Sequence, residues 1–343
     1  MANILSKIKN NFSRERFCIG LDIGTQSVKI ARLKLAKDEV TLCGFDIEPA
    51  KLELSGAFKK IKEPRFADTL NISVSGPQTV IRYANFPKMN SQELRRSLKF
   101  EAHKYIPFSV SEVNLDACIL KNDPVDSKML VLIAAAKKEM VASRLELIES
   151  INLPVNLVEV DSISLVNAFI FNNPPEDSAG DKAVALLNIG ASVSNLNILE
   201  GAIPRLSRDM HIAGNTFSQK IMDIFGVAFN DAERLKTEPE REAENEDRIN
   251  AALESVLSNM ATDIRTSFDY YESQGSSSVV KIFLSGGGAR FKGLKEALAR
   301  LLGIEVEFWD PLKRLVIDAA VGVDKAKEAS GQLAVAVGLA LRG

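Results

Sequence analysis

The sequence predicts a two-domain α/β protein in which the second domain repeats the opening of the first. The chain of 343 residues is longer than one ordinary domain and suits two. The run Leu21-Asp22-Ile23-Gly24 returns as Leu187-Asn188-Ile189-Gly190, and each run is followed by a polar turn and a second apolar stretch. A repeat at so long an offset indicates two related domains rather than a solenoid of short units.

The expected domain boundaries follow from composition. A polar stretch containing Pro174, Pro175 and Gly180 separates the two halves and is typical of an interdomain linker. The expected divisions are an N-terminal tail at 1–16, a first domain at 17–172, a linker at 173–182 and a second domain at 183–343. We also expect a small α+β module inserted at about 88–152 and a helical subdomain at about 212–278.

The elements of the first domain follow from its apolar periodicity. Three strands are predicted from short or alternating apolar runs, at 18–23, 28–35 and 39–47. The inserted module begins with a helix that Ser91 caps and that continues to about 105, before Pro107. Its other elements are expected to be strands at 113–120 and 129–135 and a helix at 138–150.

The second domain opens with the same three-stranded pattern, predicted at 183–189, 195–200 and 202–210. Helices are then expected at 214–225, 231–236 and 249–274, and the last of them carries apolar residues along one face. A buried strand at 280–284 leads through three glycines into a final predicted helix from about 292.

Composition restricts the classes of function. With 46% hydrophobic residues, 26% charged residues and a net charge of −2, the chain is typical of a soluble globular protein and gives no basic surface for nucleic acid. The three cysteines have no CxxC or metal-ligand spacing, which indicates reduced thiols. No apolar run approaches the roughly 18 residues that cross a bilayer. The tail at 1–16 has apolar and basic residues at helical spacing, so it fits either an anionic membrane surface or a locally docked tail.

Three glycine-containing turns are the candidate ligand loops, because the chain has neither a GxxxxGK[ST] nor a GxGxxG pattern. The turn at 22–27 joins an acid to small and hydroxylated residues, whose backbone can approach phosphate while the acid holds water on Mg²⁺. The turn at 188–194 has the same form without the acid. The turn at 285–289 places three glycines where a strand leads into a helix. Each turn alone also fits a plain tight connection, but their order and duplication favour a nucleotide site.

This order of features resembles the actin-like ATPases and, among them, the PilM family over nearly the whole chain. The matching motifs are Gly20-Leu21-Asp22-Ile23-Gly24 with Lys29, Glu101-Ala102 with Tyr105-Ile106-Pro107, Val160-Asp161-Ser162, His211-Ile212-Ala213-Gly214-Asn215, Ala232-Glu233-Arg234-Leu235-Lys236, Leu284-Ser285-Gly286-Gly287-Gly288-Ala289 and Ala336-Val337-Gly338-Leu339-Ala340. The resemblance implies duplicated RNase H-like domains, with the α+β insertion in the first and the helical subdomain in the second.

The resemblance also implies that ATP binds with Mg²⁺ between the domains. By matched position, the phosphate contacts are Gly24, Thr25, Gln26, Ser27 and Lys29 from one side and Asn188, Gly190 and Ala191 from the other. Asp22 would contact the metal through water. Gly214 and the adenosine-lining Gly286, Gly287 and Gly288 complete the set with Glu233 and Lys236, which would touch ribose or base. Without the resemblance, Glu233 and Lys236 are interpreted as an ordinary surface ion pair.

Two positions depart from the actin-like pattern. Asn188 stands where these ATPases usually carry Asp, and Val193 stands where they carry Thr. An amide has no charge for the water shell of Mg²⁺ and cannot act as a general base. Because no other acid occupies a comparable turn, we expect nucleotide binding with slow or absent hydrolysis.

The resemblance to PilM implies that the output is a bound partner. It predicts a cytoplasmic protein of type IV pilus assembly and twitching motility, peripheral at the inner membrane through its partner, that binds a short N-terminal cytoplasmic peptide of PilN. Other inner-membrane platform proteins and the pilus motor ATPases are further candidate partners. The peptide groove is expected to draw on residues 91–107 and 129–136.

Two other functions of the same fold stay open. A cell-division filament protein of the FtsA type would carry a C-terminal amphipathic helix, whereas this sequence ends at Leu341-Arg342-Gly343, inside an expected core helix. A sugar or acetate kinase, or a polyphosphate-type phosphatase, would need a catalytic carboxylate and usually the acid that Asn188 replaces. We interpret His103 and His211 as structural.

Overall fold

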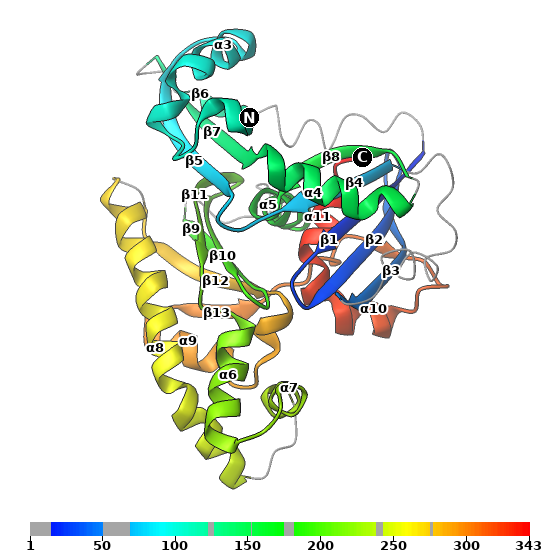
Figure 1. The fold of residues 1–343 in the computed structure, drawn as a ribbon, viewed down its shortest axis with the longest axis vertical. Coiled ribbons are helices and arrows are strands. Elements are labelled where there is room, and N and C mark those ends of the chain that lie inside the picture. The colour runs from blue at the N-terminus through cyan, green and yellow to red at the C-terminus, as the bar shows by residue number, and fades with distance from the viewer. Residues whose placement is uncertain are drawn as a thin grey trace. The chain divides into compact units, whose positions relative to one another are not determined.

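The computed structural model of the chain describes residues 15–50, 69–122, 127–151, 153–174, 182–237, 243–274 and 277–343 (Figure 1). Its contacts divide the chain into two compact units. Unit 1 comprises Met1–Asp177, Arg205–Ser207 and Pro311–Gly343, and unit 2 comprises Ser178–Pro204 and Arg208–Asp310. Most of the expected tail at 1–16 and of the expected linker at 173–182 lies outside the described residues.

A six-stranded sheet of order β14-β3-β2-β1-β4-β8 organises unit 1. Its strands are β1 (Arg16–Ile23), β2 (Ser27–Leu35), β3 (Val40–Pro49), β4 (Thr69–Val74), β8 (Val155–Val160) and β14 (Val316–Ile317). The first three strands form an antiparallel meander, and β4 and β8 extend the sheet in parallel with β1. The three predicted strands of the meander are therefore confirmed, to within two residues at each end.

Helices cover both faces of this sheet. On one face, α4 (Lys138–Ile148) contributes Ile148 to a core that contains Ile19, Leu21 and Ile72. On the other face, α5 (Asp161–Asn172) and α11 (Ala334–Ala340) pack against each other, and α11 also lies against β1. The short helix α10 (Val323–Ala329) precedes α11.

Two glycines allow α11 to approach so closely. A Cβ atom on Gly20 would lie 1.9 Å from the carbonyl oxygen of Ala336, and one on Gly338 would lie 1.8 Å from that of Ser164. No real side chain tolerates such short distances, so the packing of α11 requires glycine at both positions.

The second domain is shorter than the expected range 183–343. Residues from Pro311 onward belong to unit 1 instead, because β14 pairs with β3 and α11 contacts β1.

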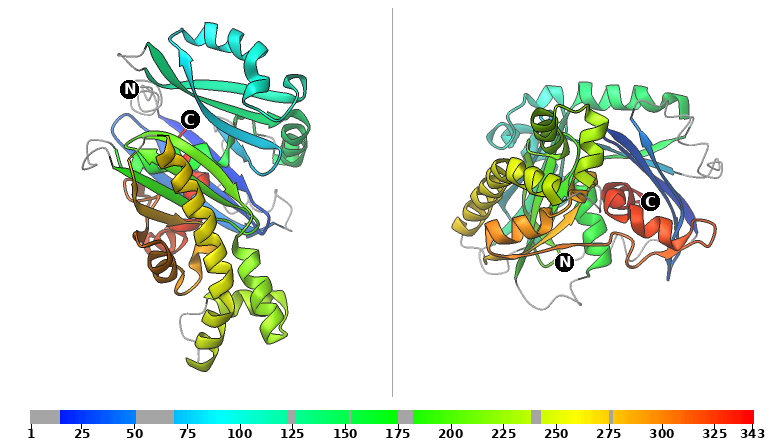
Figure 2. Two further views of the ribbon diagram at one scale, coloured as in Figure 1. Left: turned by 90° about the vertical axis from the view of Figure 1, so that its left-hand side faces the viewer. Right: turned by 90° about the horizontal axis from the view of Figure 1, so that it is seen from below.

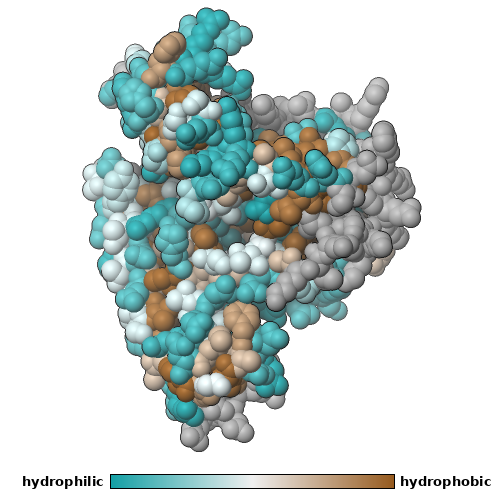
Figure 3. All heavy atoms as spheres, viewed as in Figure 1, coloured by the Kyte–Doolittle hydropathy of each residue, from teal (hydrophilic) through white to brown (hydrophobic). Residues whose placement is uncertain are grey.

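The inserted module of unit 1 is a three-stranded sheet of order β5-β7-β6 covered by one helix (Figure 2). Its elements are β5 (Thr79–Pro87), α3 (Ser91–Glu101), β6 (Val113–Asn122) and β7 (Lys128–Lys137). Leu94 and Leu98 of α3 pack on Val131 and Ile133 of the central strand. The module therefore begins about nine residues before the expected position 88. Its outer surface is largely hydrophilic where α3 lies, at the top of Figure 3.

The cap of α3 is Asn90, and the assignment of Ser91 was wrong by one residue. The Asn90 side-chain oxygen accepts hydrogen bonds from the N–H groups of Gln92 and Glu93, while the Glu93 carboxylate accepts one from the N–H of Asn90. This reciprocal capping box satisfies the backbone N–H groups of Asn90, Gln92 and Glu93 at the start of the helix. The helix ends at Glu101, and a short 3₁₀ turn at Ala102–Lys104 follows it.

Unit 2 repeats the strand order of unit 1. Its sheet runs β11-β10-β9-β12-β13, with β9 (Ala183–Ile189), β10 (Ser194–Glu200), β11 (Ile203–Met210), β12 (Val279–Ser285) and β13 (Glu305–Phe308). As in unit 1, a first strand pairs antiparallel with the second and parallel with the fourth. The same order, β3-β2-β1-β4-β8, forms the larger part of the sheet in unit 1, which is the duplication that the repeated motif predicts.

The helices of unit 2 are α6 (Gly214–Phe225), α7 (Phe229–Thr237), α8 (Ala243–Ser273) and α9 (Leu294–Leu302). The apolar face expected on the long helix α8 is buried, as Ile249, Leu253, Met260 and Ile264 show. Helix α8 begins at Ala243, ahead of the predicted start at 249. Nowhere in the described part of the chain is a helix both long and apolar enough to span a membrane.

Candidate nucleotide-binding loops and apolar groove

The turn between β1 and β2 forms the first candidate phosphate loop, in unit 1. The N–H of Gly24 donates to the carbonyl of Ser27 at 3.0 Å and closes the turn. The antiparallel register places Lys29 opposite Asp22, and the Lys29 Nζ lies 3.1 Å from Asp22 Oδ2. A Cβ on Gly24 would lie 2.7 Å from that Nζ, so the ammonium group lies directly over the loop backbone. The side chains of Thr25 and Gln26 are exposed at the tip.

Asp161, the first residue of α5, adds a second acid beside this loop. The hydroxyls of Ser73 and Ser75 donate hydrogen bonds to its carboxyl group. Burial and the neighbouring Asp22 carboxylate raise the pKa of Asp161 to about 7. Because β1, β4 and β8 are parallel, their carboxyl ends meet at one edge of the sheet, which is where open α/β sheets bind ligands.

The sequence interpretation therefore missed an acid. Asp161 does not lie in a glycine turn, because it follows β8 directly and opens α5. The available signal was an acid immediately after an apolar strand, in the motif Val160-Asp161-Ser162.

The turn between β9 and β10 forms the second loop, in unit 2, and repeats the first. The N–H of Gly190 donates to the carbonyl of Val193 at 3.0 Å, the same closure as in unit 1. The start of α6 is bonded to this loop, since Gly214 N–H donates to Gly190 O at 2.9 Å and Asn215 N–H donates to Ala191 O at 2.7 Å. The beginning of α6 is thereby held against the second loop.

The glycine run after β12 packs on the same loop. Gly286 has φ +92°, and a Cβ there would lie 2.3 Å from the carbonyl oxygen of Ile189. A Cβ on Gly288 would lie 2.7 Å from the oxygen of Gly190. These two glycines are therefore required by close contact between loops, and their approach to an adenosine stays a prediction.

Lys236 and Glu233 of α7 complete the set in unit 2. The Lys236 Nζ lies 2.5 Å from Glu233 Oε1 and 2.8 Å from Ser218 Oγ, and it donates to the carbonyl of Gly214 at 3.3 Å. The Lys236 side chain is only 3% exposed, and its burial lowers the pKa of the ammonium group. The alternative of an ordinary surface ion pair is therefore wrong, because Lys236 is tied to the start of α6.

Asn188 occupies the end of β9 as a hydrogen-bonded amide. Its oxygen accepts from the Ser285 hydroxyl at 3.1 Å, and its Nδ2 donates to Asn195 Oδ1 at 3.3 Å. Asn195 in turn donates to Asp209 Oδ1 at 2.8 Å. A carboxylate at position 188 could not donate a hydrogen bond to Asn195 Oδ1. The Asn188 amide therefore belongs to a hydrogen-bond network that an aspartate would break.

The structure thus gathers the predicted site residues within each unit. Unit 1 groups the residues of the first loop and its flanking strands: Asp22, Gly24, Thr25, Gln26, Ser27 and Lys29. Unit 2 groups four segments that are far apart in sequence: Asn188 with Gly190 and Ala191, Gly214, Glu233 with Lys236, and Gly286, Gly287 and Gly288.

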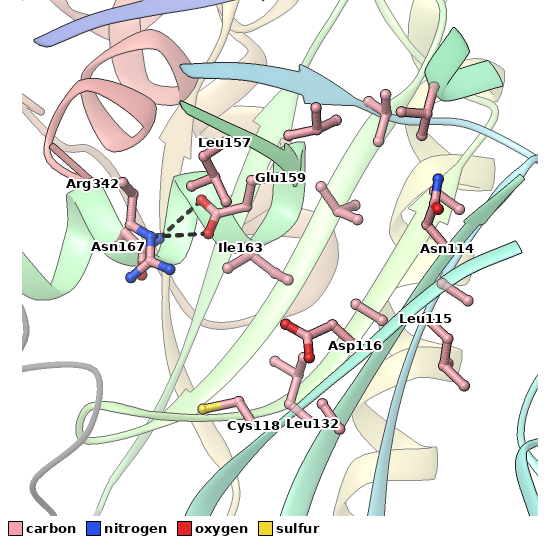
Figure 4. Close-up of a pocket in the computed structure, with 18 residues that line it drawn as sticks. Asn114, Leu115, Asp116, Cys118, Leu132, Leu157, Glu159, Ile163, Asn167 and Arg342 are labelled. Atoms are coloured by element: carbon pink, nitrogen blue, oxygen red, sulfur yellow. Dashed lines mark hydrogen bonds and ion pairs between the residues drawn. The ribbon is translucent and has the colours of Figure 1, made fainter. Parts of the chain in front are cut away.

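A separate apolar groove of about 460 Å³ lies within unit 1 (Figure 4). Residues of β6, β7, β8 and α5 line it, and its apolar walls include Leu132, Leu157 and Ile163. The strand expected at 129–136 therefore contributes to it. On the other face of β6 lies a second hollow of about 520 Å³, to which α3 contributes Arg95 and Lys99.

One buried polar cluster interrupts the groove. Glu159, 8% exposed, pairs through Oε1 with the Arg342 Nε at 3.2 Å. Its other oxygen accepts from the Ser164 hydroxyl at 2.8 Å and the Asn167 amide at 3.1 Å. Burial raises the pKa of Glu159, against the opposing effect of Arg342. Figure 4 shows Glu159, Asn167 and Arg342 together, with Asp116 and Cys118 of β6 lying apart from them.

Comparison with known proteins places these features in a family. Residues 20–343 match the family described as type IV pilus assembly protein PilM. The solved PilM-PilN type IV pilus biogenesis complex is similar with a TM-score of 0.82 and 24% identity, over 95% of this chain and 98% of that chain. The ethanolamine utilization protein EutJ from Carboxydothermus hydrogenoformans is similar with a TM-score of 0.54 and 11% identity, over 96% and 90% of the two chains.

The two structural likenesses confirm the predicted actin-like ATPase fold. The family match covers nearly the whole chain, from the strand that precedes the first loop to the last residue. The protein therefore belongs to the PilM family of type IV pilus assembly proteins.

Proposed function

We propose that this chain is a nucleotide-binding adaptor of type IV pilus assembly, which binds ATP with Mg²⁺ and a short cytoplasmic N-terminal peptide of PilN. The observation that carries the proposal is the apolar groove of unit 1, in a chain whose family assembles type IV pili. A solved structure with the same fold is itself a complex of PilM with PilN.

The loops support nucleotide binding in their chemistry. Both glycine turns are closed by the same backbone hydrogen bond, and the Lys29 ammonium lies over the first of them, where a phosphate would find a cation. In unit 2, the buried Lys236 and the partly exposed Glu233 adjoin the start of α6. The Lys29 cation of unit 1 suits a phosphate group, and the Glu233 and Lys236 pair of unit 2 suits ribose hydroxyls.

The acids of unit 1 fit Mg²⁺. This ion prefers oxygen ligands and is commonly held by one or two carboxylates together with substrate phosphates and water. Asp22 and Asp161 supply two carboxyl groups at the carboxyl ends of β1 and β8. When bound, the ion would neutralise phosphate charge, and Asp22 would hold it through water.

Hydrolysis is proposed to be slow or absent. Asn188 presents a neutral amide that is already engaged with Ser285 and Asn195. Asp161 is an acid, but it opens α5 in unit 1, and its carboxyl group already accepts hydrogen bonds from the hydroxyls of Ser73 and Ser75. Nucleotide would then stabilise the fold rather than drive a reaction cycle.

The groove supports peptide binding. An extended segment with a few apolar anchors suits a concave surface of this size and composition. Through PilN the protein would be peripheral at the inner membrane on its cytoplasmic side. Other platform proteins and the pilus motor ATPases are proposed as further partners, which would connect the adaptor to twitching motility.

A peptide titration tests this function. The probe is a synthetic peptide of the N-terminal cytoplasmic residues of PilN, titrated calorimetrically into the full chain with and without ATP and Mg²⁺. Leu157→Arg and Ile163→Arg place a charge in the groove and should each abolish binding. Leu147→Arg is the matched control, because Leu147 is 56% exposed on α4 and does not line the groove. Absence of binding to the unmodified chain under both conditions would refute the proposal.

A further inference from the structure

Phe100 projects from the outer face of α3. Its side chain is 80% exposed, which is the largest exposed fraction among the large apolar residues of the described structure. Leu94 and Leu98 occupy the opposite face of the helix and are buried against the inserted sheet. At about 3.6 residues per turn, Phe100 lies about 200° around the helix axis from Leu98 and therefore points away from the sheet. Core packing does not explain a phenylalanine at this position.

Basic side chains surround Phe100 on this outer face. Arg96 and Lys104 lie four residues before and after it, and Lys99 and His103 lie beside them. All four of these side chains are exposed. The His103 ring nitrogen Nδ1 lies 2.9 Å from the Phe100 carbonyl oxygen, which holds the 3₁₀ turn against the end of the helix. We refer to these five residues as the basic face of α3.

The acids of α3 do not neutralise this basic face. The Glu93 carboxylate accepts a hydrogen bond from the N–H of the helix cap. Glu101 pairs with Lys104 at 3.6 Å. In the part of the chain that the structure describes, Arg96 and Lys99 have no carboxylate partner. These two cations, beside an exposed aromatic ring, are therefore available to an external anion.

The net charge of the inserted module is opposite in sign to that of the whole chain. Residues 79–137 contain nine Lys and Arg residues and six Asp and Glu residues, a net charge of +3, whereas the chain of 343 residues carries −2. Positive charge is thus concentrated on the module, and the rest of the chain is acidic. A local basic surface of this kind attracts an anionic partner, which the net charge of the whole chain does not reveal.

Shape indicates which anionic partner fits. The outer face of an exposed helix is convex, and Phe100 stands out from it and does not line the hollow of about 520 Å³ to which Lys99 contributes. A folded protein would need a matching cavity for the ring, and a nucleic acid would need a longer track of cations along its phosphates. A fluid layer of lipid headgroups accepts an aromatic ring together with the flexible basic side chains around it.

We propose that the basic face of α3 binds the surface of an anionic lipid bilayer, with the Phe100 ring in the headgroup layer and Arg96 and Lys99 on lipid phosphates. The peptide groove lies on the other face of the inserted sheet, so the lipid contact leaves it open. A few cations and one ring give weak, reversible binding, and stable attachment to a membrane takes a second signal. The lipid contact would thus add to attachment through a membrane-bound partner.

Vesicle binding by the full chain, without nucleotide or peptide, tests this contact. The probes are vesicles of phosphatidylcholine alone and vesicles of phosphatidylcholine and phosphatidylglycerol in equal parts. Affinity should be at least tenfold higher for the anionic vesicles and should fall as salt is added, because each cation near an anionic surface contributes about fivefold. A chain that binds neither vesicle, or both equally, would overturn the inference and leave the basic face to an acidic protein.

Two double variants separate α3 from other segments. Arg96→Glu with Lys99→Glu should lower the affinity for anionic vesicles at least tenfold. Lys37→Glu with Lys327→Glu makes the same charge change at exposed positions outside the inserted module and should keep the affinity within threefold. Equal losses in the two variants would contradict the assignment to α3. Unchanged affinity in the first variant would assign the binding to another segment, such as the basic tail at 1–16, and would also overturn it.

Phe100→Trp measures entry of the ring directly. The chain has a single tryptophan, Trp309, which is buried, so the unmodified chain supplies a constant background. The emission of the new indole should shift to shorter wavelength on anionic vesicles and stay unshifted on neutral ones. Binding without a shift would refute the role of Phe100. Because neither peptide nor nucleotide is present, failure of these tests leaves the proposed peptide and nucleotide functions intact.

Discussion

The Lys29 ammonium lies 3.1 Å from the Asp22 carboxylate, and the two side chains are only 15% and 11% exposed. The pair keeps a cation directly over the first loop. Phosphate groups arriving at this loop would share Lys29 with Asp22, while a divalent cation would take over the neutralisation of Asp22.

Replacing Lys29 should therefore weaken nucleotide binding. Lys29→Met removes the cation and leaves Asp22 unpaired beside Asp161, so we expect ATP affinity to fall about tenfold or more, consistent with about 1.5–3 kcal/mol for a charge-assisted hydrogen bond. Calorimetric titration with ATP and Mg²⁺ measures the change. Lys34→Met is the control, since Lys34 pairs with Glu15 on an exposed part of the same sheet and should bind ATP as the unmodified chain does.

The pKa of Asp161 predicts how stability depends on pH. With a pKa of about 7 in the folded chain and an ordinary value of 3.8, the folded state retains a proton that the unfolded chain releases between those values. The folded state then binds more protons, so its stability falls as pH rises from about 4 to about 7. Asp161→Asn keeps an acceptor for Ser73 and Ser75 without titrating.

In the absence of nucleotide and metal, Asp161→Asn should flatten this slope and gain about 1–3 kcal/mol relative to the unmodified chain at pH 8, since one pKa unit corresponds to about 1.4 kcal/mol. Denaturant unfolding at pH 5 and pH 8 provides the comparison. An unchanged pH slope in the variant would show that Asp161 is not the titrating group.

Lys236 should contribute to the stability of unit 2. Lys236→Met removes the donor to Glu233, Ser218 and Gly214. Glu233 is 36% exposed and can recover some hydration, so we expect a loss of about 1–3 kcal/mol, below that of a fully buried pair. Arg234→Met, on the same helix with an exposed partner, Asp231, should lose less than about 1 kcal/mol in the same unfolding measurement. Equal losses would mean that burial of Lys236 carries no particular stabilisation.

Asn188 should limit hydrolysis. Asn188→Asp supplies the acid that this loop lacks, at the loss of the hydrogen bond to Asn195, and should raise phosphate release about tenfold or more while ATP still binds. A coupled phosphate assay under saturating ATP measures it. Two results would count against this role: rapid turnover by the unmodified chain, or unchanged turnover in a variant that binds ATP normally.

Local patterns predicted much of this structure. The duplicated turns are predictable because the motif around Gly24 returns around Gly190. Each turn also closes between residues that are close in sequence, as in a hairpin. The apolar face of α8 was likewise visible as a helical period. The helix cap was misplaced by one residue, because Asn90 and Ser91 are both good caps and only the geometry decides between them.

Contacts between segments that are far apart in the sequence were harder to predict. Asp161 lies beside Asp22 because β8 joins the sheet through β4. No local sequence pattern predicts this strand order. The return of 311–343 to unit 1 depends on a two-residue strand, β14, and on the close packing of α11 at Gly20 and Gly338. The adenosine contacts of Gly286 and Gly288 stay a prediction, because the φ of +92° at Gly286 and the close contacts of both glycines are explained by packing on Ile189 and Gly190.

The central claim is that the product of this protein is a bound partner, with nucleotide retained rather than consumed. The most direct measurement follows peptide binding and phosphate release in one sample of the full chain, with ATP, Mg²⁺ and the PilN peptide. We expect saturable binding of one peptide per chain while phosphate release stays negligible over many binding lifetimes. A chain that binds no peptide, or that releases phosphate steadily as peptide binds, would contradict it.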